Sequence, residues 1–241
     1  MKSLLKQIKN RRHLIFLDLE GTQFSHEMIA LGAVKVDINR SGKILVIHKG
    51  MKVLVKPQGK IGTFVTNLTG ITKEQIDQDG ISFADALIQL KKYCGLTFSR
   101  SVFVTFGNHD LRIVMQSLAH NPAANADIAK YICRNDIDLS ATLAQYIKDA
   151  NNNPFSLMNY LKVFGVTPEG VAHDPLWDAK NLVLLYQAAM SKNEIVFDEY
   201  LKLLGNMRHL PEPITQVVSK LVRGEDVTSA SFKELVRESV K

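Results

Sequence analysis

Five residues in three short, widely separated segments have side chains suited to acid–base or metal chemistry. They are four carboxylates and one histidine, in the order Asp18, Glu20, Asp110, His173 and Asp178. Carboxylate oxygens are the ligands that Mg²⁺ and Mn²⁺ prefer in proteins, and a histidine can take up a proton near neutral pH. Each segment alone is weak evidence, so the elements that carry these side chains decide what they can do together.

The first two acids end an apolar run of strand length that begins at His13. Side chains alternate between the two faces of a strand, so Asp18 and Glu20 should share one face while Leu17 and Leu19 share the other. Neighbouring carboxylates repel each other unless a cation or protons neutralise them. The alternative is a strand end that frays into water, and an isolated Asp-x-Glu pattern would favour it.

Asp110 follows a second β-rich run, residues 101–106, which breaks at Gly107. The next residues have the spacing of an amphipathic helix, with apolar side chains at Leu111, Val114, Met115 and Leu118. Asp110 is therefore predicted to lie where a strand gives way to a helix. The alternative is a first-turn acid favoured by the helix dipole, and for this residue alone that interpretation is preferred.

The third segment begins a helix, because Asp174 is a suitable N-cap and Pro175 a suitable first helical residue. His173 then lies just outside the helix and Asp178 about one turn inside it, so both can face one pocket. A loop histidine beside a metal-bound water is a reasonable general base. The alternative is a surface histidine with an acid that complements the helix dipole. Together, the three segments predict a metal-dependent phosphodiesterase.

With these residues, the chain resembles the DEDDh-type 3′ to 5′ exonucleases of the ribonuclease H-like superfamily over residues 11–190. The motifs that match are Asp18-Leu19-Glu20, Asp110 within Gly107-Asn108-His109-Asp110, and His173 followed by Asp178. Further matching stretches are Val55–Pro57, Phe64–Thr72, Asp138–Ser140, and the helix from Ser156-Leu157 to Phe164–Val166. The resemblance is closest to the branch of KapD-like bacterial proteins and of histone-mRNA-end and siRNA-degrading exonucleases.

Two residues depart from the family pattern. Gly21 stands where many members have Thr, and Trp177 stands where many have Asp. Neither departure removes a catalytic group, but each alters a position expected near the terminal nucleotide.

The resemblance implies a mechanism with two divalent metal ions, Mg²⁺ or Mn²⁺, about 4 Å apart. One ion would be held by Asp18, Glu20 and Asp178, and Asp110 would complete the shell of a second ion that Asp18 shares. His173 would deprotonate the attacking water, which releases a nucleoside 5′-monophosphate from the 3′ end. The substrate-binding residues would be Leu19, Gly21 and Thr22. The expected partner is a single-stranded RNA or DNA 3′ end, read through phosphate and sugar with little regard to base identity.

The coarse pattern predicts an α/β fold, a ribonuclease H-like mixed sheet flanked by helices with a helical C-terminal extension. The expected strands lie near residues 13–19, 29–38, 44–56, 102–106 and 135–139. The expected helices lie near residues 82–94, 110–119, 140–150, 156–164 and 175–190, and further helical patterns follow residue 191.

This pattern divides the chain into a basic N-terminal arm (1–12), an exonuclease domain (13–190) and a helical C-terminal extension (191–241). The arm carries Lys2, Lys6, Lys9, Arg11 and Arg12 and no acid. Such clusters attract polyanions, but three apolar residues could instead dock a short helix on the body: Leu4, Leu5 and Ile8. The extension is expected to pack on the domain or on a protein partner, or to self-associate.

Composition sets broader limits. The chain has 241 residues, 46% of them hydrophobic, and a net charge of +6, which suits one substantial core with an appendage. No apolar run approaches the roughly 20 residues that span a membrane. The first residues lack an export signal, and Cys94 and Cys133 have no metal-binding spacing, so a cytoplasmic protein with reduced thiols is expected.

Two functions of other classes remain open from the sequence. One is a proofreading subunit of a polymerase, with the extension as its docking element. The other is a catalytically silent nucleic-acid-binding scaffold, which the intact set of five residues disfavours.

Overall fold

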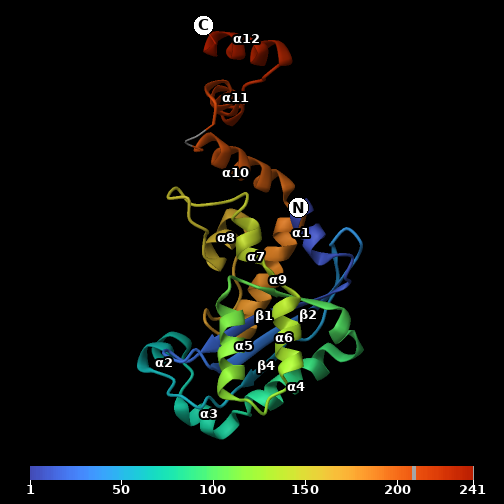
Figure 1. Cartoon of the computed structure of the whole chain (residues 1–241), viewed down its shortest axis with the longest axis vertical. Coiled ribbons are helices and arrows are strands. Elements are labelled where there is room, and N and C mark those ends of the chain that lie inside the picture. Colours follow the sequence, from blue (N-terminus) through green and yellow to red (C-terminus); the bar gives the residue numbers. More distant parts are fainter. Residues whose placement is uncertain (208–209, 241) are drawn as a thin grey trace.

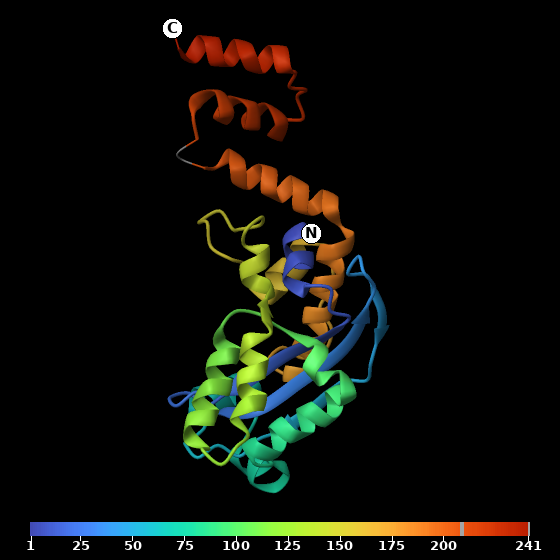
Figure 2. The same ribbon diagram turned by 45° about the vertical axis from the view of Figure 1, so that its right-hand side comes forward.

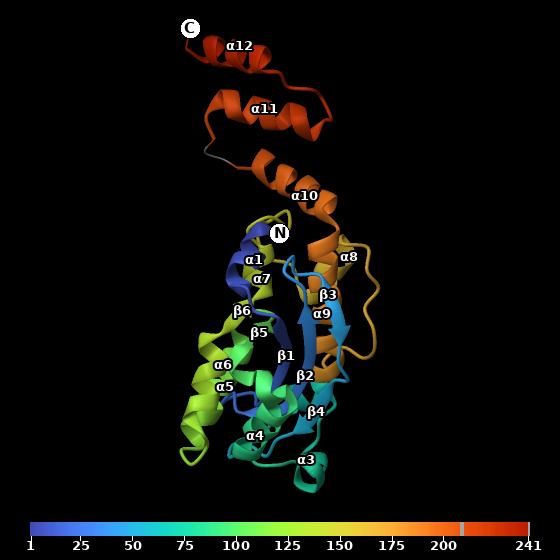
Figure 3. The same ribbon diagram turned by 90° about the vertical axis from the view of Figure 1, so that its right-hand side faces the viewer.

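The computed structural model describes residues 1–207 and 210–240, and its centre is a mixed sheet of six strands. The strands are β1 (His13–Gly21), β2 (Met28–Ile38), β3 (Ile44–Ile47), β4 (Met51–Leu54), β5 (Ser101–Thr105) and β6 (Asp136–Asp138). Their order across the sheet is β3-β2-β1-β5-β6, and β4 pairs with β2 (Figure 3). The pairs formed by β2 are antiparallel, whereas β1, β5 and β6 run parallel.

Helices cover both faces of this sheet (Figure 1). They are α1 (Lys2–Ile8), α2 (Thr63–Thr69), α3 (Lys73–Asp79), α4 (Phe83–Cys94), the 3₁₀ helix η1 (Gly95–Arg100), α5 (His109–His120), α6 (Ala126–Arg134), α7 (Leu139–Leu143), α8 (Leu157–Val163) and α9 (Pro175–Ser191). On one face, α1, α7, α8 and α9 share a core with Leu14 and Phe16 of β1. On the other, α4, α5 and α6 share a core with Ile15 and Leu17. None of the described helices is long and apolar enough to cross a bilayer.

This architecture confirms the predicted fold class, but one predicted strand is wrong. Residues 44–56 form two strands, because β3 pairs with the end of β2 and β4 with its first half. Gly50 lies between them, where a Cβ atom would come within 2.4 Å of Leu176 Cδ1. Leu176 belongs to α9, so this helix, which is distant in the sequence, packs against the chain between β3 and β4.

The helices differ from the prediction in two ways. The helix expected over 140–150 ends at Leu143, and the chain then turns at Asp149, whose carboxylate accepts the backbone N–H groups of Asn151 (2.9 Å) and Asn153 (2.7 Å). The short helices α2, α3 and α6 were not predicted, because seven to nine residues give too few turns for the periodicity to be recognised.

The first eight residues dock on the body. Helix α1 buries Leu4 and Ile8 in the core that α9 also lines, and Gln7 Nε2 donates to Thr142 Oγ1 at 3.0 Å. This contact matches the docked-helix alternative. The basic residues of this segment therefore surround a packed helix, and their contact with nucleic acid stays a prediction, as does the division into three domains.

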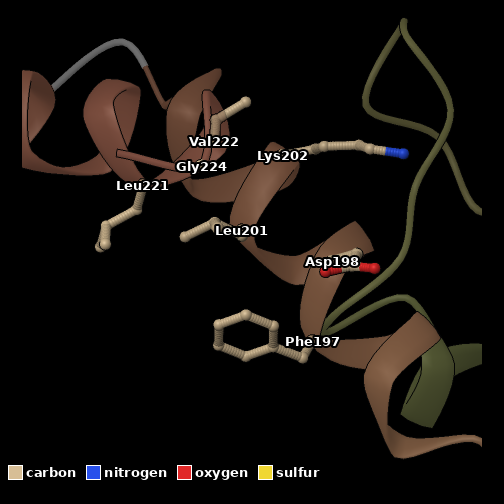
Figure 4. Close-up of a pocket in the computed structure, with 7 residues that line it drawn as sticks. All are labelled: Phe197, Asp198, Leu201, Lys202, Leu221, Val222 and Gly224. Carbon is tan, nitrogen blue, oxygen red and sulfur yellow. The ribbon is translucent and has the colours of Figure 1, made fainter. Parts of the chain in front are cut away.

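The C-terminal region is a stack of three helices that leads away from the sheet (Figures 1 and 2). They are α10 (Asn193–Gly205), α11 (Glu212–Val222) and α12 (Ser229–Ser239), and among their described residues only Val218 and Leu235 are buried. A hollow of about 300 Å³ lies between α10 and α11, lined by apolar residues such as Phe197 and Leu221 and by the charged residues Asp198 and Lys202 (Figure 4). Partner binding through this extension stays a prediction.

Candidate active site

The carboxyl end of β1 extends beyond its parallel neighbour. Pairing between β1 and β5 ends at Phe16, whereas β1 continues to Gly21. Asp18 and Glu20 follow Phe16 on the face that α9 covers, while Leu19 packs into the opposite core. The predicted division of faces is therefore correct, and the two acids project into the space that β5 leaves free.

Asp110 fills part of this space from α5. Its side chain is 5% exposed, and its Oδ1 accepts the backbone N–H of Leu19 at 2.8 Å. This N–H belongs to the part of β1 that has no partner on the β5 side. The carboxylate of Asp110 thus completes the strand edge and lies beside Asp18 and Glu20, in a role that a solvated first-turn acid would not have.

Helix α9 brings the third segment to the same place. Asp174 caps the helix, as predicted, because its Oδ1 accepts the N–H groups of Leu176 (3.0 Å) and Trp177 (3.3 Å). One turn later, Asp178 is 8% exposed and its Oδ2 accepts the N–H of His173 at 2.8 Å. Its Oδ1 is buried and has no hydrogen-bond partner among the described residues. A buried carboxylate oxygen without a donor is a position that a cation can satisfy.

A glycine in β2 allows this helix to approach the sheet. Gly32 is opposite Asp18 in the β1–β2 register, and a Cβ atom at Gly32 would lie 2.1 Å from the carbonyl carbon and oxygen of Pro175. The first turn of α9 therefore rests on the backbone of β2 next to Asp18. We did not predict this role, although an isolated glycine within a strand is a recognised sign of close backbone approach.

His173 is exposed on the loop before α9, in the left-handed region with φ of 63°. One ligand atom each from Glu20, His173 and Asp178 lies within 4.8 Å of the other two. The histidine ring therefore faces the carboxylates, which is the placement predicted for a general base. The same distance would also allow His173 to bind a cation directly.

Burial and mutual repulsion raise the pKa values of these acids. Burial, followed by the negative charges of Asp110 and Asp178, raises the pKa of Asp18 well above its ordinary value. Burial and the charge of Asp178 raise the pKa of Glu20 to about 7. Burial raises the pKa of Asp110 to about 8, although the hydrogen bond from the N–H of Leu19 acts to lower it. The pKa of Asp178 is also raised, chiefly by burial.

The donor set suits a divalent cation. No Lys or Arg within residues 1–207 and 210–240 forms an ion pair with any of the four carboxylates. Their charge is therefore unbalanced by the protein, and hard oxygen donors around the unpartnered Oδ1 of Asp178 are what Mg²⁺ or Mn²⁺ requires.

Comparison with known proteins agrees with this site. The family model RNase_T, described as exonuclease, matches residues 15–186. The chain belongs to this exonuclease family. No curated protein sequence matches the chain.

Solved structures show the same fold. The nuclease domain of 3′hExo, described as a DEDDh family member bound to rAMP, has a TM-score of 0.62 at 18% identity over 78% of this chain and 95% of that domain. Cell-death related nuclease 4 (CRN-4) has a TM-score of 0.60 at 20% identity, over 76% and 64% of the two chains. Exonuclease I of E. coli, in complex with a dT13 oligonucleotide, has a TM-score of 0.58 at 17% identity, over 81% and 44%. The predicted family and its ribonuclease H-like fold are thus confirmed.

The three predicted substrate-binding residues are packed in the interior of this exonuclease. Leu19 is 4% exposed and belongs to the core beneath α5. A Cβ atom on Gly21 would lie 2.9 Å from Ile113 Cγ1, so the glycine is needed for α5 to pack. Thr22 is buried, and its hydroxyl accepts the N–H of Glu27 at 3.0 Å. Contacts from these positions to a nucleotide stay predictions and would have to use the backbone.

Asp136 is a further, partly buried acid that the sequence pattern did not predict. Its Oδ2 accepts the Thr105 hydroxyl at 3.1 Å, while its Oδ1 is buried without a described partner. Burial raises its pKa to about 7, and its negative charge contributes to the raised pKa of Asp110. Only the position of β6 next to β5 brings it to this region, so no local sequence pattern would have identified it.

Proposed function

We propose that this exonuclease is a divalent-metal-dependent enzyme that removes nucleotides from single-stranded 3′ ends and releases nucleoside 5′-monophosphates. The observation that carries the proposal is the convergence of Asp18, Glu20, Asp110 and Asp178 at the free end of β1, with His173 facing them. A site with four uncompensated acids and one exposed histidine is suited to hydrolysis of an anionic ester.

The site residues would have two roles, metal binding and proton transfer. Asp18, Glu20, Asp110 and Asp178 would hold two ions of Mg²⁺ or Mn²⁺. Bound there, divalent ions would polarise the phosphoryl oxygens and lower the pKa of a water molecule. His173 would accept a proton from the attacking water on a ring nitrogen, and its exposed position lets it pass that proton to solvent.

Two exposed aromatic residues support a single-stranded substrate. Phe24 is 75% exposed on the turn after β1, and Phe64 is 63% exposed on α2. The two segments are joined beside them, because Gln23 N–H donates to the carbonyl of Ile61 at 2.8 Å. Aromatic faces stack on unpaired bases of any identity, so these rings are suited to hold the last bases of a strand.

The proposed substrate class includes both RNA and DNA. Among proteins of this fold, the 3′hExo domain is described with rAMP and E. coli exonuclease I with a DNA oligonucleotide. We propose that the present enzyme accepts one or both, and that the 3′ end must be unpaired.

The direct test uses a 5′-labelled single-stranded oligonucleotide and a matched 3′-labelled one. We expect a ladder from the first and immediate release of labelled mononucleotide from the second, with both reactions abolished by EDTA and restored by Mg²⁺ or Mn²⁺. Asp18→Asn is the control for contaminating nucleases. Cleavage that persists in EDTA would contradict the mechanism, and binding without cleavage in Mn²⁺ would favour a silent scaffold.

Substrate class is tested with matched single-stranded RNA, single-stranded DNA and duplexes with 3′ overhangs. Replacing Phe24 or Phe64 with Ala should weaken binding by about 1–3 kcal/mol per lost stacking contact. Leu96→Ala is the matched control, since Leu96 is 95% exposed in η1. Unchanged affinity in both Phe variants would remove these rings from the substrate path.

A further inference from the structure

The loop that carries His173 has an unusual backbone. It connects α8 to α9, and three of its residues lie in the left-handed region: Gly165 (φ 60°), Gly170 (φ 71°) and His173 (φ 63°). This region is uncommon for residues other than glycine. The conformation that turns His173 toward the acids is therefore not one that the loop would keep by itself, and contacts from α9 must select it.

One such contact is Asn181, which is fully buried on α9. Its Oδ1 accepts the backbone N–H of Glu169 at 2.8 Å, and its Nδ2 donates to the carbonyl of the same residue at 3.0 Å. At the other end of the loop, the N–H of His173 is bonded to Asp178. The loop is thus fixed at both ends, and residues 170–172 lie between the two anchors.

Trp177 of α9 packs against the loop between these two anchors. A Cβ atom on Gly170 would lie 2.0 Å from Trp177 Cδ2 and 2.2 Å from Cγ, so the indole lies directly against the glycine backbone. Lys180 Nζ lies 3.8 Å from the centre of the Trp177 ring, a distance at which a cation is attracted to an aromatic face. Trp177 is the residue at which this chain departs from the family pattern, and it is the single tryptophan of the sequence.

We propose that Trp177, packed on Gly170 and beside Lys180, is a positioning residue that holds the loop closed and so presents His173 to the acids. This role rests on the proposed function, because it gives His173 its task as the general base. Trp177 acts through His173, because its side chain contacts Gly170 of the loop and Lys180 of α9. An indole in place of a small acid supplies a flat surface that a glycine can lie against, and no such surface exists in an Asp side chain.

The kinetic test is a double-mutant cycle between Trp177→Ala and His173→Ala. Loss of positioning should lower kcat by roughly 10- to 100-fold in Trp177→Ala, with KM nearly unchanged. In the His173→Ala background, the same substitution should cost less than about twofold, because its effect passes through the removed side chain. Trp177→Phe keeps a planar ring on Gly170 and should recover most of the rate. An equal loss in both backgrounds, or a change in KM alone, would overturn the proposal.

A second measurement does not depend on activity. Because Trp177 is the single tryptophan, acrylamide quenching of the intrinsic fluorescence reports how well the loop covers it. Gly170→Ala puts a methyl group into the indole, so quenching should increase relative to the wild-type protein, while circular dichroism stays unchanged. Equal quenching in Gly170→Ala and the wild-type protein would contradict the proposed packing of Trp177 on Gly170. If the wild-type protein cleaved no nucleic acid, the proposed function would fail, yet this measurement would still decide whether Trp177 holds the loop.

Discussion

The two ends of strand β1 treat their charges in opposite ways. Beside the start of this strand, Asp37 of the neighbouring strand β2 is hydrogen-bonded through Oδ1 to His13 Nδ1 at 2.6 Å and through Oδ2 to His48 Nε2 at 2.7 Å. Partial burial raises the pKa of Asp37, but these two bonds outweigh it, and the pKa lies below its ordinary value. At the other end, burial and the negative charges of neighbouring acids raise the pKa values of Asp18 and Glu20.

This difference separates a carboxylate with two hydrogen-bond partners from the acids of the candidate site. Asp37 has a partner for each oxygen, so its charge favours the folded state. The acids around Asp18 make the metal-free fold less stable, and a protein tolerates such a cost where the site has a task. The comparison predicts that substitutions of the site acids mainly reduce activity, whereas a substitution of Asp37 mainly reduces stability.

The largest effect is expected from Asp18→Asn or Asp178→Asn. Loss of a metal ligand should lower turnover by at least about 10³-fold, because the metal contributes several kcal/mol to the transition state. The melting temperature of the metal-free variant should rise, because one repelling charge is gone. Steady-state assays and calorimetry in EDTA measure the two effects. Asp37→Asn is the matched control and should keep its activity. Near-wild-type turnover in either site variant would exclude that residue from the site.

His173→Ala should reduce turnover by about 10²- to 10⁴-fold, the usual contribution of a general base. Metal affinity should change little. The wild-type rate should fall as the pH drops through the range in which histidine side chains become protonated, and the variant should lack this acid limb. A pH–rate profile combined with calorimetric Mn²⁺ titration distinguishes the possibilities. Loss of Mn²⁺ binding would make His173 a ligand, which its distance to Glu20 and Asp178 also permits.

The metal-free protein should lose stability as the pH rises. The pKa of Glu20 is raised to about 7 and that of Asp110 to about 8, so the folded state holds protons that the unfolded chain has released. Their stabilising contribution is complete below the unfolded values near pH 4 and is lost as the pH rises through 7 to 8. For Glu20 alone this loss is about 3 kcal/mol. Urea unfolding in EDTA at pH 5 and pH 8 measures it, and added Mg²⁺ should restore stability at pH 8. A flat profile in EDTA would contradict the assignment.

The smallest effect is expected from Asp37→Asn. The free energy of unfolding should fall by about 1 kcal/mol near pH 7, because the hydrogen bonds of Asp37 to His13 and His48 are weakened. The effect is small because both pairs are partly exposed to solvent. The pKa of Asp37 is lowered, so this contribution is present above the unfolded value and disappears as the pH falls through the folded one. Wild-type and variant proteins should therefore converge in acid. A loss of nuclease activity in Asp37→Asn would contradict this prediction, because it would show that Asp37 influences the distant acids.

Long elements with local signals were predictable from the sequence. Helix α9 has a cap, a proline and many apolar residues within its own segment, and β1 has a continuous apolar run. Elements whose limits depend on distant partners were not. β3 and β4 are separate because they pair with different parts of β2, and α7 is followed by a turn in which Asp149 accepts backbone N–H groups.

The same distinction applies to the site. The convergence of the four acids and His173 was predictable because residue type and order carried the family resemblance. Gly32 and Asn181 were not, because their roles depend on contacts with Pro175 and with Glu169. Both lie in segments that look purely structural: a strand interior and an apolar helix face. Only the packing of α9 on the sheet reveals what they support.

The length of α9 also determines how the enzyme can be held. Asp178 lies in its first turn, whereas the extension is attached at its last, where Lys192 ends α9 and begins α10. Thirteen residues of helix place these points roughly 20 Å apart. A surface, a tether or a fused protein joined to α12 would therefore leave the entrance for a nucleic-acid end unobstructed. The enzyme could be immobilised by its C-terminal helices and still receive a strand at the opposite end of the sheet.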